Sequence, residues 1–163
     1  MNKKDKIIYL FIGVLFLVLI YNTSSSFLES AKPKGKYINE PAKGYREYSE
    51  RLEWIWNDIP KALELAGEEN KLVLVDFWAV WCVWCIKADK ITFPDSEVED
   101  LILKYFIIVK VDVDRYPGLQ SRYGARALPT VVILDSDGNK LGSIIGFREP
   151  FEFSQLLRQF IQG

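Results

Sequence analysis

The 163-residue chain contains no histidine at all. Because histidine is the base of Ser-His-Asp and Cys-His sites and a frequent metal ligand, its absence excludes these catalytic classes and every His-based metal centre. Cysteine is also scarce, with two residues in the whole chain. Two cysteines without histidine cannot supply the four ligands of a structural zinc site. We therefore expect neither a bound metal nor another cofactor, and thiols and carboxylates are left as the groups for chemistry near neutral pH.

A large excess of charge of either sign is absent as well. The chain carries 21 Lys and Arg against 22 Asp and Glu, which gives a net charge of −1. Binding of nucleic acid through a basic surface is therefore not expected, since it needs a clear excess of positive charge. Apolar residues make up 49% and charged residues 26%, the composition of a chain that folds around a hydrophobic core. The length leaves room for about one domain with short additions.

One long apolar run is present near the N-terminus, where residues 7–21 (IIYLFIGVLFLVLIY) contain no charged side chain. A full membrane span needs about 20 residues, a length that the run reaches when it extends to Leu28. Lysines followed by an apolar run also fit a cleavable signal peptide, but no clear cleavage site follows. We favour an uncleaved single-pass anchor over residues 1–28. Lysines lie closer to the run on its N-terminal side, which favours an extracytoplasmic domain, periplasmic or at the cell surface.

Residues 29–44 are polar and contain lysine, proline and glycine, which is typical of a linker, and residues 45–163 form the expected soluble domain. Hydrophobic periodicity in this domain predicts helix, strand, helix, helix, strand, helix, strand, strand and helix, over approximately 45–70, 71–79, 82–90, 95–106, 106–114, 116–124, 129–135, 140–147 and 149–162. Pro60 is expected to divide the first helical stretch. The order indicates an α/β fold with a central mixed sheet, one antiparallel edge, and helices on both faces.

Both cysteines lie in VDFWAVWCVWC, three residues apart at the expected start of a helix. Residues at this spacing share one helical face, and their Cα atoms lie near the roughly 5.5 Å that a disulfide prefers. Cys82, at the helix N-terminus, faces unpaired N–H groups that favour the thiolate, the attacking species. Cys85 lies one turn further in and is placed to resolve a mixed disulfide. A static disulfide is the alternative, although so short a loop would stabilise little.

A base near Cys85 would help the resolving step by accepting its proton. Asp76 is the candidate, because it interrupts an apolar strand six residues before Cys82 and a buried carboxylate is costly unless it is compensated. Lys110 interrupts the apolar strand FIIVKVDVD in the same way and could pair with Asp76. The alternative is that Asp76 lies at a strand end and faces solvent.

These features together resemble the thioredoxin superfamily. LVDFWAVWCVWC is similar to the family's strand and active-site signature, LPT at 128–130 to its cis-proline motif, and DSDGNKLGSIIGF to its terminal hairpin. The resemblance implies that Cys82 is the nucleophile and Cys85 the resolving cysteine of a thiol:disulfide oxidoreductase. It also implies that Asp76 is a buried acid with Lys110 beside it.

The same resemblance implies a substrate-binding role for residues outside the cysteine motif. Pro129 is expected to be a cis-proline that faces the disulfide, and Leu128 to offer backbone hydrogen bonds to an extended substrate. Gly146 stands where the family leaves room for the bound chain. The match covers about residues 48–162.

One subgroup resembles the chain further, because TFPDSEV after the active-site helix is similar to the C-terminal domain of DsbD-type thiol:disulfide interchange proteins and related membrane-anchored thioredoxin-like proteins. Those domains pass electrons to extracytoplasmic substrates. DsbD-type proteins also contain a multi-span electron-carrying domain, whereas this chain has one short hydrophobic segment. The resemblance therefore implies protein thiol and disulfide substrates and a separate electron-donor protein.

Three residues around the cysteines, Trp81, Val83 and Trp84, are expected to contact protein partners. Packing of Trp84 within the molecule is the alternative for that side chain. The dipeptide between the cysteines contains no proline or histidine, which favours a reductant or an electron relay. A disulfide-donating oxidase, and a binding or assembly module that keeps the fold without the chemistry, remain the alternative functions.

Overall fold

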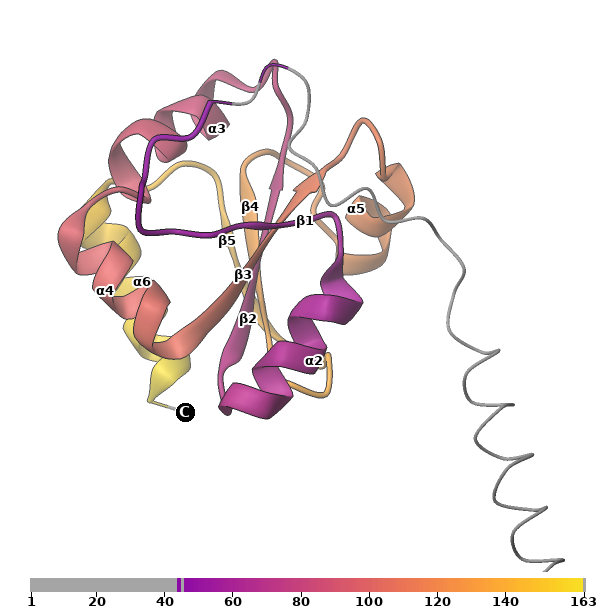
Figure 1. The fold of residues 1–163 in the computed structure, drawn as a ribbon. Coiled ribbons are helices and arrows are strands. Elements are labelled where there is room, and N and C mark those ends of the chain that lie inside the picture. Colours follow the sequence, from indigo (N-terminus) through magenta and orange to yellow (C-terminus); the bar gives the residue numbers. More distant parts are fainter. Residues whose placement is uncertain (1–43, 45, 163) are drawn as a thin grey trace, which may run out of the picture. The chain divides into compact units, whose positions relative to one another are not determined.

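The centre of the domain is a five-stranded sheet, seen in Figure 1 in a computed structural model that describes Gly44 and residues 46–162. Across the sheet the strands are β1 (Ile55–Trp56), β3 (Phe106–Asp112), β2 (Leu72–Trp78), β4 (Thr130–Leu134) and β5 (Lys140–Ile145). β1, β3 and β2 are parallel, whereas β4 is antiparallel to β2, and β5 to β4. The predicted mixed sheet is confirmed, and β4 as well as the terminal hairpin strand pairs in the antiparallel sense.

Helices cover both faces of the sheet, as predicted. Helices α2 (Ile59–Glu69) and α5 (Pro117–Tyr123) pack on one face, and α4 (Ser96–Tyr105) and α6 (Pro150–Ile161) pack on the other (Figure 1). The active-site helix α3 (Val83–Lys87) runs directly into a π-helical turn, η1 (Ala88–Thr92). Single π-helical turns of this kind are often found at functional sites.

The apolar strand β2 lies at the middle of the sheet and contributes to both hydrophobic cores. Side chains alternate along a strand, so Val73 and Val75 enter the core on the α2 and α5 face, while Leu74 enters the core beneath α4 and α6. All three are fully buried. Asp76 follows Leu74 by two residues, so its side chain points to the same face of the sheet. This is the face that carries α3 and η1.

The predicted helix over residues 45–70 is wrong in its first half. β1 forms there instead, and it pairs with β3 along the edge of the sheet. Asn57 then takes a left-handed conformation (φ 58°), which ends the strand. The side chain of Asp58 caps α2 by accepting a hydrogen bond from the N–H of Lys61, and Pro60 occupies the first turn, where its missing N–H costs nothing. The division that Pro60 was expected to make is thus a helix start.

Two other helices start or end at residues that satisfy the helix terminus. Asp95 caps α4 by accepting from the N–H groups of Glu97 and Val98 at 3.1 and 3.2 Å. Gly124 ends α5 in a left-handed conformation (φ 70°), which glycine adopts without steric cost.

The predicted membrane anchor over 1–28 and all but the last residue of the predicted linker over 29–44 lie outside the described residues. Among the helices that the structure describes, none combines the length and the apolar character needed to cross a bilayer.

Candidate active site

The two cysteines form a disulfide at the start of α3, with their Cα atoms 5.2 Å apart. Cys82 is the N-cap residue of this helix, and its Sγ accepts a hydrogen bond from the N–H of Cys85 at 3.1 Å. Cys85 lies within the first turn and is less exposed than Cys82, at 2% against 6%. The predicted placement of one sulfur at the helix terminus and the other behind it is confirmed.

Leu128 of the LPT segment lines the same cleft as Cys82, and a cis peptide bond joins Leu128 to Pro129, as the motif predicts. The carbonyl of Pro129 accepts a hydrogen bond from the N–H of Gly146 at 2.8 Å. This bond joins the start of β4 to the end of β5. Gly146 has φ +82°, a conformation that side chains other than glycine rarely adopt.

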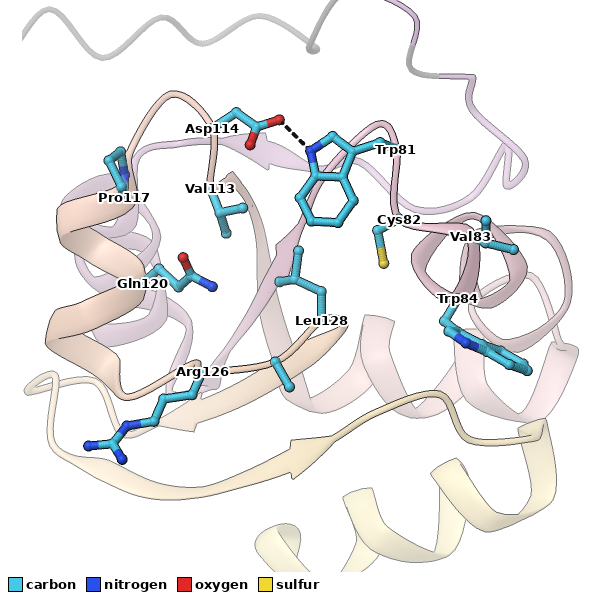
Figure 2. A pocket seen from close by; sticks show the side chains of 11 residues that line it. Trp81, Cys82, Val83, Trp84, Val113, Asp114, Pro117, Gln120, Arg126 and Leu128 are labelled. Atoms are coloured by element: carbon cyan, nitrogen blue, oxygen red, sulfur yellow. Dashed lines mark hydrogen bonds between the residues drawn. The ribbon is translucent and has the colours of Figure 1, made fainter.

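An open cleft of about 770 Å³ lies in front of Cys82, shown in Figure 2. Four of the predicted substrate-binding residues line it together with Cys82, namely Trp81, Val83, Trp84 and Leu128. The remaining lining residues are Val113, Asp114, Pro117, Gln120, Arg126 and Ala127. Pro129 and Gly146 are not among the lining residues, and Pro129 is buried. We name this feature the front cleft.

Trp81 projects from the loop before α3 and is 63% exposed. Its indole Nε1–H donates a hydrogen bond to Asp114 Oδ2 at 2.8 Å, which fixes the ring over the cleft (Figure 2). The ring therefore offers an apolar face at a defined position, which lowers the entropic cost of contact with a partner.

Trp84 packs within the molecule, as the alternative interpretation predicted, and its expected contact with a partner stays a prediction. Its ring packs against Phe147 with centroids 5.7 Å apart, and Lys87 Nζ lies 4.1 Å from the Phe147 centroid and 5.6 Å from that of Trp84. Lys87 is itself held by an ion pair with Glu149 at 3.0 Å. Trp84 nevertheless remains 56% exposed, so one side of the ring is packed and the other faces solvent beside Cys82.

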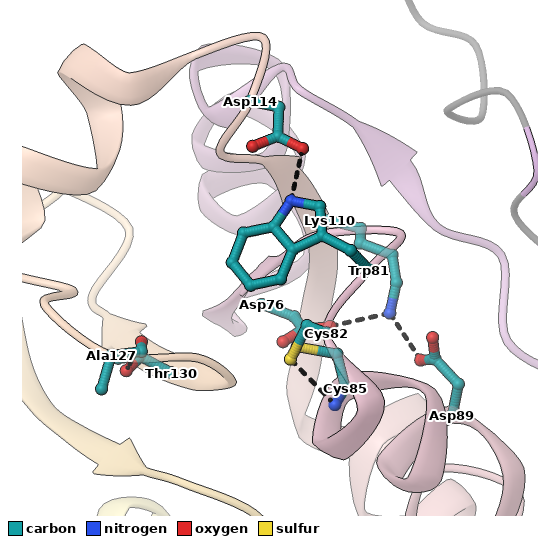
Figure 3. The surroundings of a disulfide bond; sticks show 9 residues. All are labelled: Asp76, Trp81, Cys82, Cys85, Asp89, Lys110, Asp114, Ala127 and Thr130. Carbon is teal, nitrogen blue, oxygen red and sulfur yellow. Dashed lines mark hydrogen bonds and ion pairs between the residues drawn. A yellow bond between two sulfur atoms is a disulfide. The ribbon is translucent and has the colours of Figure 1, made fainter.

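Behind the disulfide lies a buried charged cluster, shown in Figure 3. Lys110 Nζ donates to Asp76 Oδ2 at 2.7 Å and to Asp89 Oδ1 at 2.6 Å, and each of the three side chains is at least 95% buried. The predicted pairing of Asp76 with Lys110 is confirmed, and the two residues are direct neighbours in the register of β2 and β3. The expectation that Asp76 could instead face solvent is wrong. Asp76 Oδ1 has no hydrogen-bond partner among the described residues.

The ammonium group of Lys110 is also enclosed by aromatic rings. Its Nζ lies 4.2 Å from the ring centroid of Trp54, 5.1 Å from that of Phe93 and 5.5 Å from that of Trp78. Cations are attracted to the faces of such rings, particularly where water is excluded. The aromatic residues and the carboxylates together make it possible for a lysine to remain charged in the interior.

Asp89 is the member of the cluster that sequence reasoning missed. Burial raises its pKa from 3.8 to about 6, against the opposing attraction of Lys110 and with a further increase from the negative charge of Asp76. The signal in the sequence was its spacing, because Asp89 follows Cys85 by four residues and so lies on the same inward face. Its neighbours Lys87 and Lys90 made the segment look like a solvated helix surface.

Comparison with known proteins agrees with this geometry. Residues 59–161 match the model of the thioredoxin-like domain family, and the chain belongs to that family. It is similar to a thioredoxin of Listeria monocytogenes, with 34% identity over 90 residues that cover 55% of this chain and 84% of that protein.

Two solved structures extend the comparison. A thioredoxin from Thermus thermophilus superposes with a TM-score of 0.60 at 29% identity, covering 68% of this chain and 88% of its own. The oxidised C-terminal domain of DsbD from Neisseria meningitidis superposes with a TM-score of 0.54 at 25% identity, covering 61% of this chain and 90% of its own. The chain is therefore a thioredoxin-like thiol:disulfide oxidoreductase, with Cys82 and Cys85 as its disulfide pair.

Proposed function

We propose that this protein is a membrane-anchored oxidoreductase that reduces, or relays electrons to, protein disulfides outside the cytoplasm. The observation that carries the proposal is the asymmetry of the two sulfurs. Cys82 caps α3 and lines the front cleft beside Leu128, whereas Cys85 lies behind it and does not line the cleft. A partner in the cleft therefore meets Cys82 first.

The proposed reaction begins with both cysteines reduced. The Cys82 thiolate attacks a substrate disulfide, forms a mixed disulfide and releases the first substrate thiolate. Cys85 then loses its proton and attacks Cys82 Sγ, which releases the second substrate thiolate and closes the Cys82–Cys85 disulfide. The substrate gains two electrons and the protein loses two. The backbone N–H of Cys85, which points at Cys82 Sγ, favours the thiolate in the first step.

The residues around the front cleft suit an extended protein substrate. Leu128, beside the cis bond, is positioned to offer backbone hydrogen bonds, as the family resemblance implies. Trp81, Val83 and Trp84 are exposed by 63, 73 and 56% and form an apolar rim. Exposed apolar groups rimmed by polar residues favour a role in protein contact.

The direction of electron flow is proposed from the residues that surround Cys82. The dipeptide Val83-Trp84 carries no charge, and the guanidinium of Arg126 points away from Cys82 in the view of Figure 2. A nearby cation would stabilise the thiolate and make the couple more oxidising. The uncharged dipeptide therefore favours a reductant or relay, and the electron donor would then be a separate protein.

The proposed place of action comes from the sequence outside the described residues. The apolar run over 7–21 and the lysines on its N-terminal side favour a single-pass anchor with the domain outside the cytoplasm. The likeness to the DsbD C-terminal domain supports the same assignment.

Cysteine replacement combined with trapping tests the proposed chemistry. The full-length parent should reduce the disulfides of insulin, and Cys82→Ser should abolish this activity. Cys85→Ser should accumulate a mixed disulfide through Cys82, because the resolving thiol is gone, and non-reducing electrophoresis with mass spectrometry measures it. Cys82→Ser is the matched control and should trap much less. Equal activity of the parent and both single variants would contradict the proposal and favour a binding module.

The reduction potential separates the reductant from a disulfide donor. Equilibration of the parent with glutathione buffers should give a potential below about −200 mV, whereas a strong disulfide donor has one near −120 mV. A potential near −120 mV would contradict the proposed direction and indicate that the protein donates its disulfide to substrates.

A further inference from the structure

A second cavity, of about 300 Å³, opens near the active-site helix. It is lined by Gly44, Arg46, Tyr48, Trp78, Val80, Ile86, Asp89 and Lys90. Among the described residues, none lines both this cavity and the front cleft. We name it the rear cavity. The site therefore has two openings: one reaches Cys82 and the other reaches the charged cluster through Asp89.

A continuous set of polar contacts joins the interior to the rear cavity. Asp76 lies on the sheet face beneath α3, and its Oδ2 accepts from Lys110 at 2.7 Å. The same ammonium group donates to Asp89 Oδ1 at 2.6 Å. Asp89 belongs both to this cluster and to the wall of the rear cavity. A proton taken up at Asp76 can thus reach Asp89 over two hydrogen bonds.

The resolving step creates a need for such a route. Cys85 must lose a proton while the mixed disulfide holds a substrate chain over the front cleft, which is the side that a bound partner covers. The unpartnered Oδ1 of Asp76 is available as the first acceptor, and in the view of Figure 3 the Asp76 carboxyl lies behind the disulfide. A proton held there has to leave before the next cycle begins.

We propose that Asp89 is the exit of a proton path that runs from Cys85 through Asp76 and Lys110 into the rear cavity. The inference rests on the proposed thiol–disulfide exchange. Asp89 acts through Lys110 and Asp76, so it is a positioning residue, whereas the cysteines are the catalytic ones.

The proton balance of the path is simple. Cys85–SH gives its proton to the Asp76 carboxylate and, as the thiolate, attacks Cys82 Sγ. Lys110 gives one of its protons to Asp89 and becomes a neutral amine, and after the Asp76 carboxyl turns this amine takes the proton from Asp76, so the lysine ends as it began. Asp89 then releases the proton to water in the rear cavity. No electrons move along the path, because the two electrons leave with the substrate thiolates.

The charges that face Asp89 suit this role. Lys110 and Asp76 face it from the sheet, and Arg46, Tyr48 and Lys90 line the cavity with it, with Lys90 Nζ 5.7 Å from the Tyr48 ring centroid. Burial raises the pKa of Asp89 to about 6. A carboxyl with a pKa in this range can accept a proton from the cluster and return it to water near neutral pH.

The test uses the full-length reduced protein and dithiobis(nitrobenzoate), an aromatic disulfide. Its first coloured thiolate reports attack by Cys82, and its second reports resolution by Cys85, so stopped-flow absorbance separates the two steps. Asp89→Asn should slow the second step about tenfold at pH 7, which is less than the roughly hundredfold or more that a group in direct proton transfer contributes, because Asp89 acts through Lys110 and Asp76. The first step should keep its rate. In the parent the second step should accelerate as pH rises through about 6, and this inflection should be missing from the variant.

Two further variants distinguish a proton path from a structural effect. Asp89→Ala opens space at the cavity wall, and added formate should restore part of the second step, because a carboxylate in solution can replace the lost one. Glu99→Gln removes another carboxylate that is buried to a similar degree, at 6% against 5% exposed, and should leave both steps unchanged. Circular dichroism verifies that each variant is folded.

An unchanged rate and pH profile in Asp89→Asn would overturn the inference. Equal slowing of both steps without rescue by formate would also overturn it, since it would assign Asp89 a purely structural role. Failure of the proposed function looks different, because the parent itself would then release neither thiolate rapidly.

Discussion

Asp76, Asp89 and Lys110 place two carboxylates around one ammonium group, so the cluster carries a net charge of −1 when all three are ionised. An excess negative charge in the interior is costly, because burial removes most of the hydration that would stabilise it. Burial raises the pKa of Asp89 to about 6 for this reason. The ionised form of Asp89, which accepts the proton in the proposed path, is thus expected to reduce the stability of the fold.

This cost gives a prediction at the scale of one residue. Between pH 3.8 and about 6, the folded protein holds a proton on Asp89 that the unfolded chain has lost, so stability falls as pH rises through this window. Asp89→Asn removes the effect. The variant and the parent should have similar free energies of unfolding near pH 4, and at pH 7 the variant should be the more stable by on the order of 3 kcal/mol.

Urea denaturation at the two pH values measures this difference. A gap between the two proteins that does not change with pH would contradict the raised pKa. Taken with the kinetic test, the result would show a residue that lowers stability while it supports turnover, which is common at functional sites.

Sequence reasoning located part of this cluster because two of its members break an apolar pattern. Asp76 and Lys110 each interrupt a strand that is otherwise hydrophobic, and their burial and pairing are as predicted. Asp89 breaks no pattern, because charged residues are expected on an exposed helix. Its burial depends on how α3 and η1 rest on the sheet, a tertiary arrangement that local periodicity does not encode.

At the scale of elements, the predicted boundaries agree well with the structure where a local residue satisfies the helix end itself. Asp95 and Gly124 are examples. The error over residues 45–58 has a different origin, because β1 is only two residues long and exists through its pairing with β3. The apolar residues in this stretch have helical spacing although they form no helix. They are apolar because side chains such as Leu52 are buried in the core beneath α4 and α6.

Removal of a cap gives the prediction at this scale. Asp95→Ala would leave the N–H groups of Glu97 and Val98 without their side-chain acceptor at the start of α4. Loss of such a cap costs about 1 kcal/mol of stability. Urea denaturation should show this loss while insulin reduction stays at the parental rate, because α4 does not line the front cleft.

The conservative variant Asp95→Ser keeps a hydroxyl that can accept the same hydrogen bonds and serves as the matched control. It should recover most of the stability. If Asp95→Ala and Asp95→Ser were equally stable, capping would not be what Asp95 contributes.

At the scale of the whole chain, the proposed place of action divides the sequence into a short apolar run and a catalytic domain on opposite sides of the linker. An extracytoplasmic site would also explain why the sequence contains no cysteine besides the two at the active site. Any further thiol in an oxidising compartment could form a wrong disulfide. The same scarcity makes topology measurable, because a cysteine introduced into a cysteine-free variant is the sole thiol to react.

The final prediction uses Asp137→Cys in a full-length protein that also carries Cys82→Ser and Cys85→Ser. Asp137 lies exposed in the turn before β5, so a thiol there is open to reagents. In intact cells, a membrane-impermeant maleimide should label this protein without lysis, and the labelled protein should stay with the membrane after alkaline extraction. The cysteine-free variant should remain unlabelled. Labelling that requires lysis would place the domain in the cytoplasm, and release of labelled protein by alkaline extraction would replace the anchor with a cleaved signal.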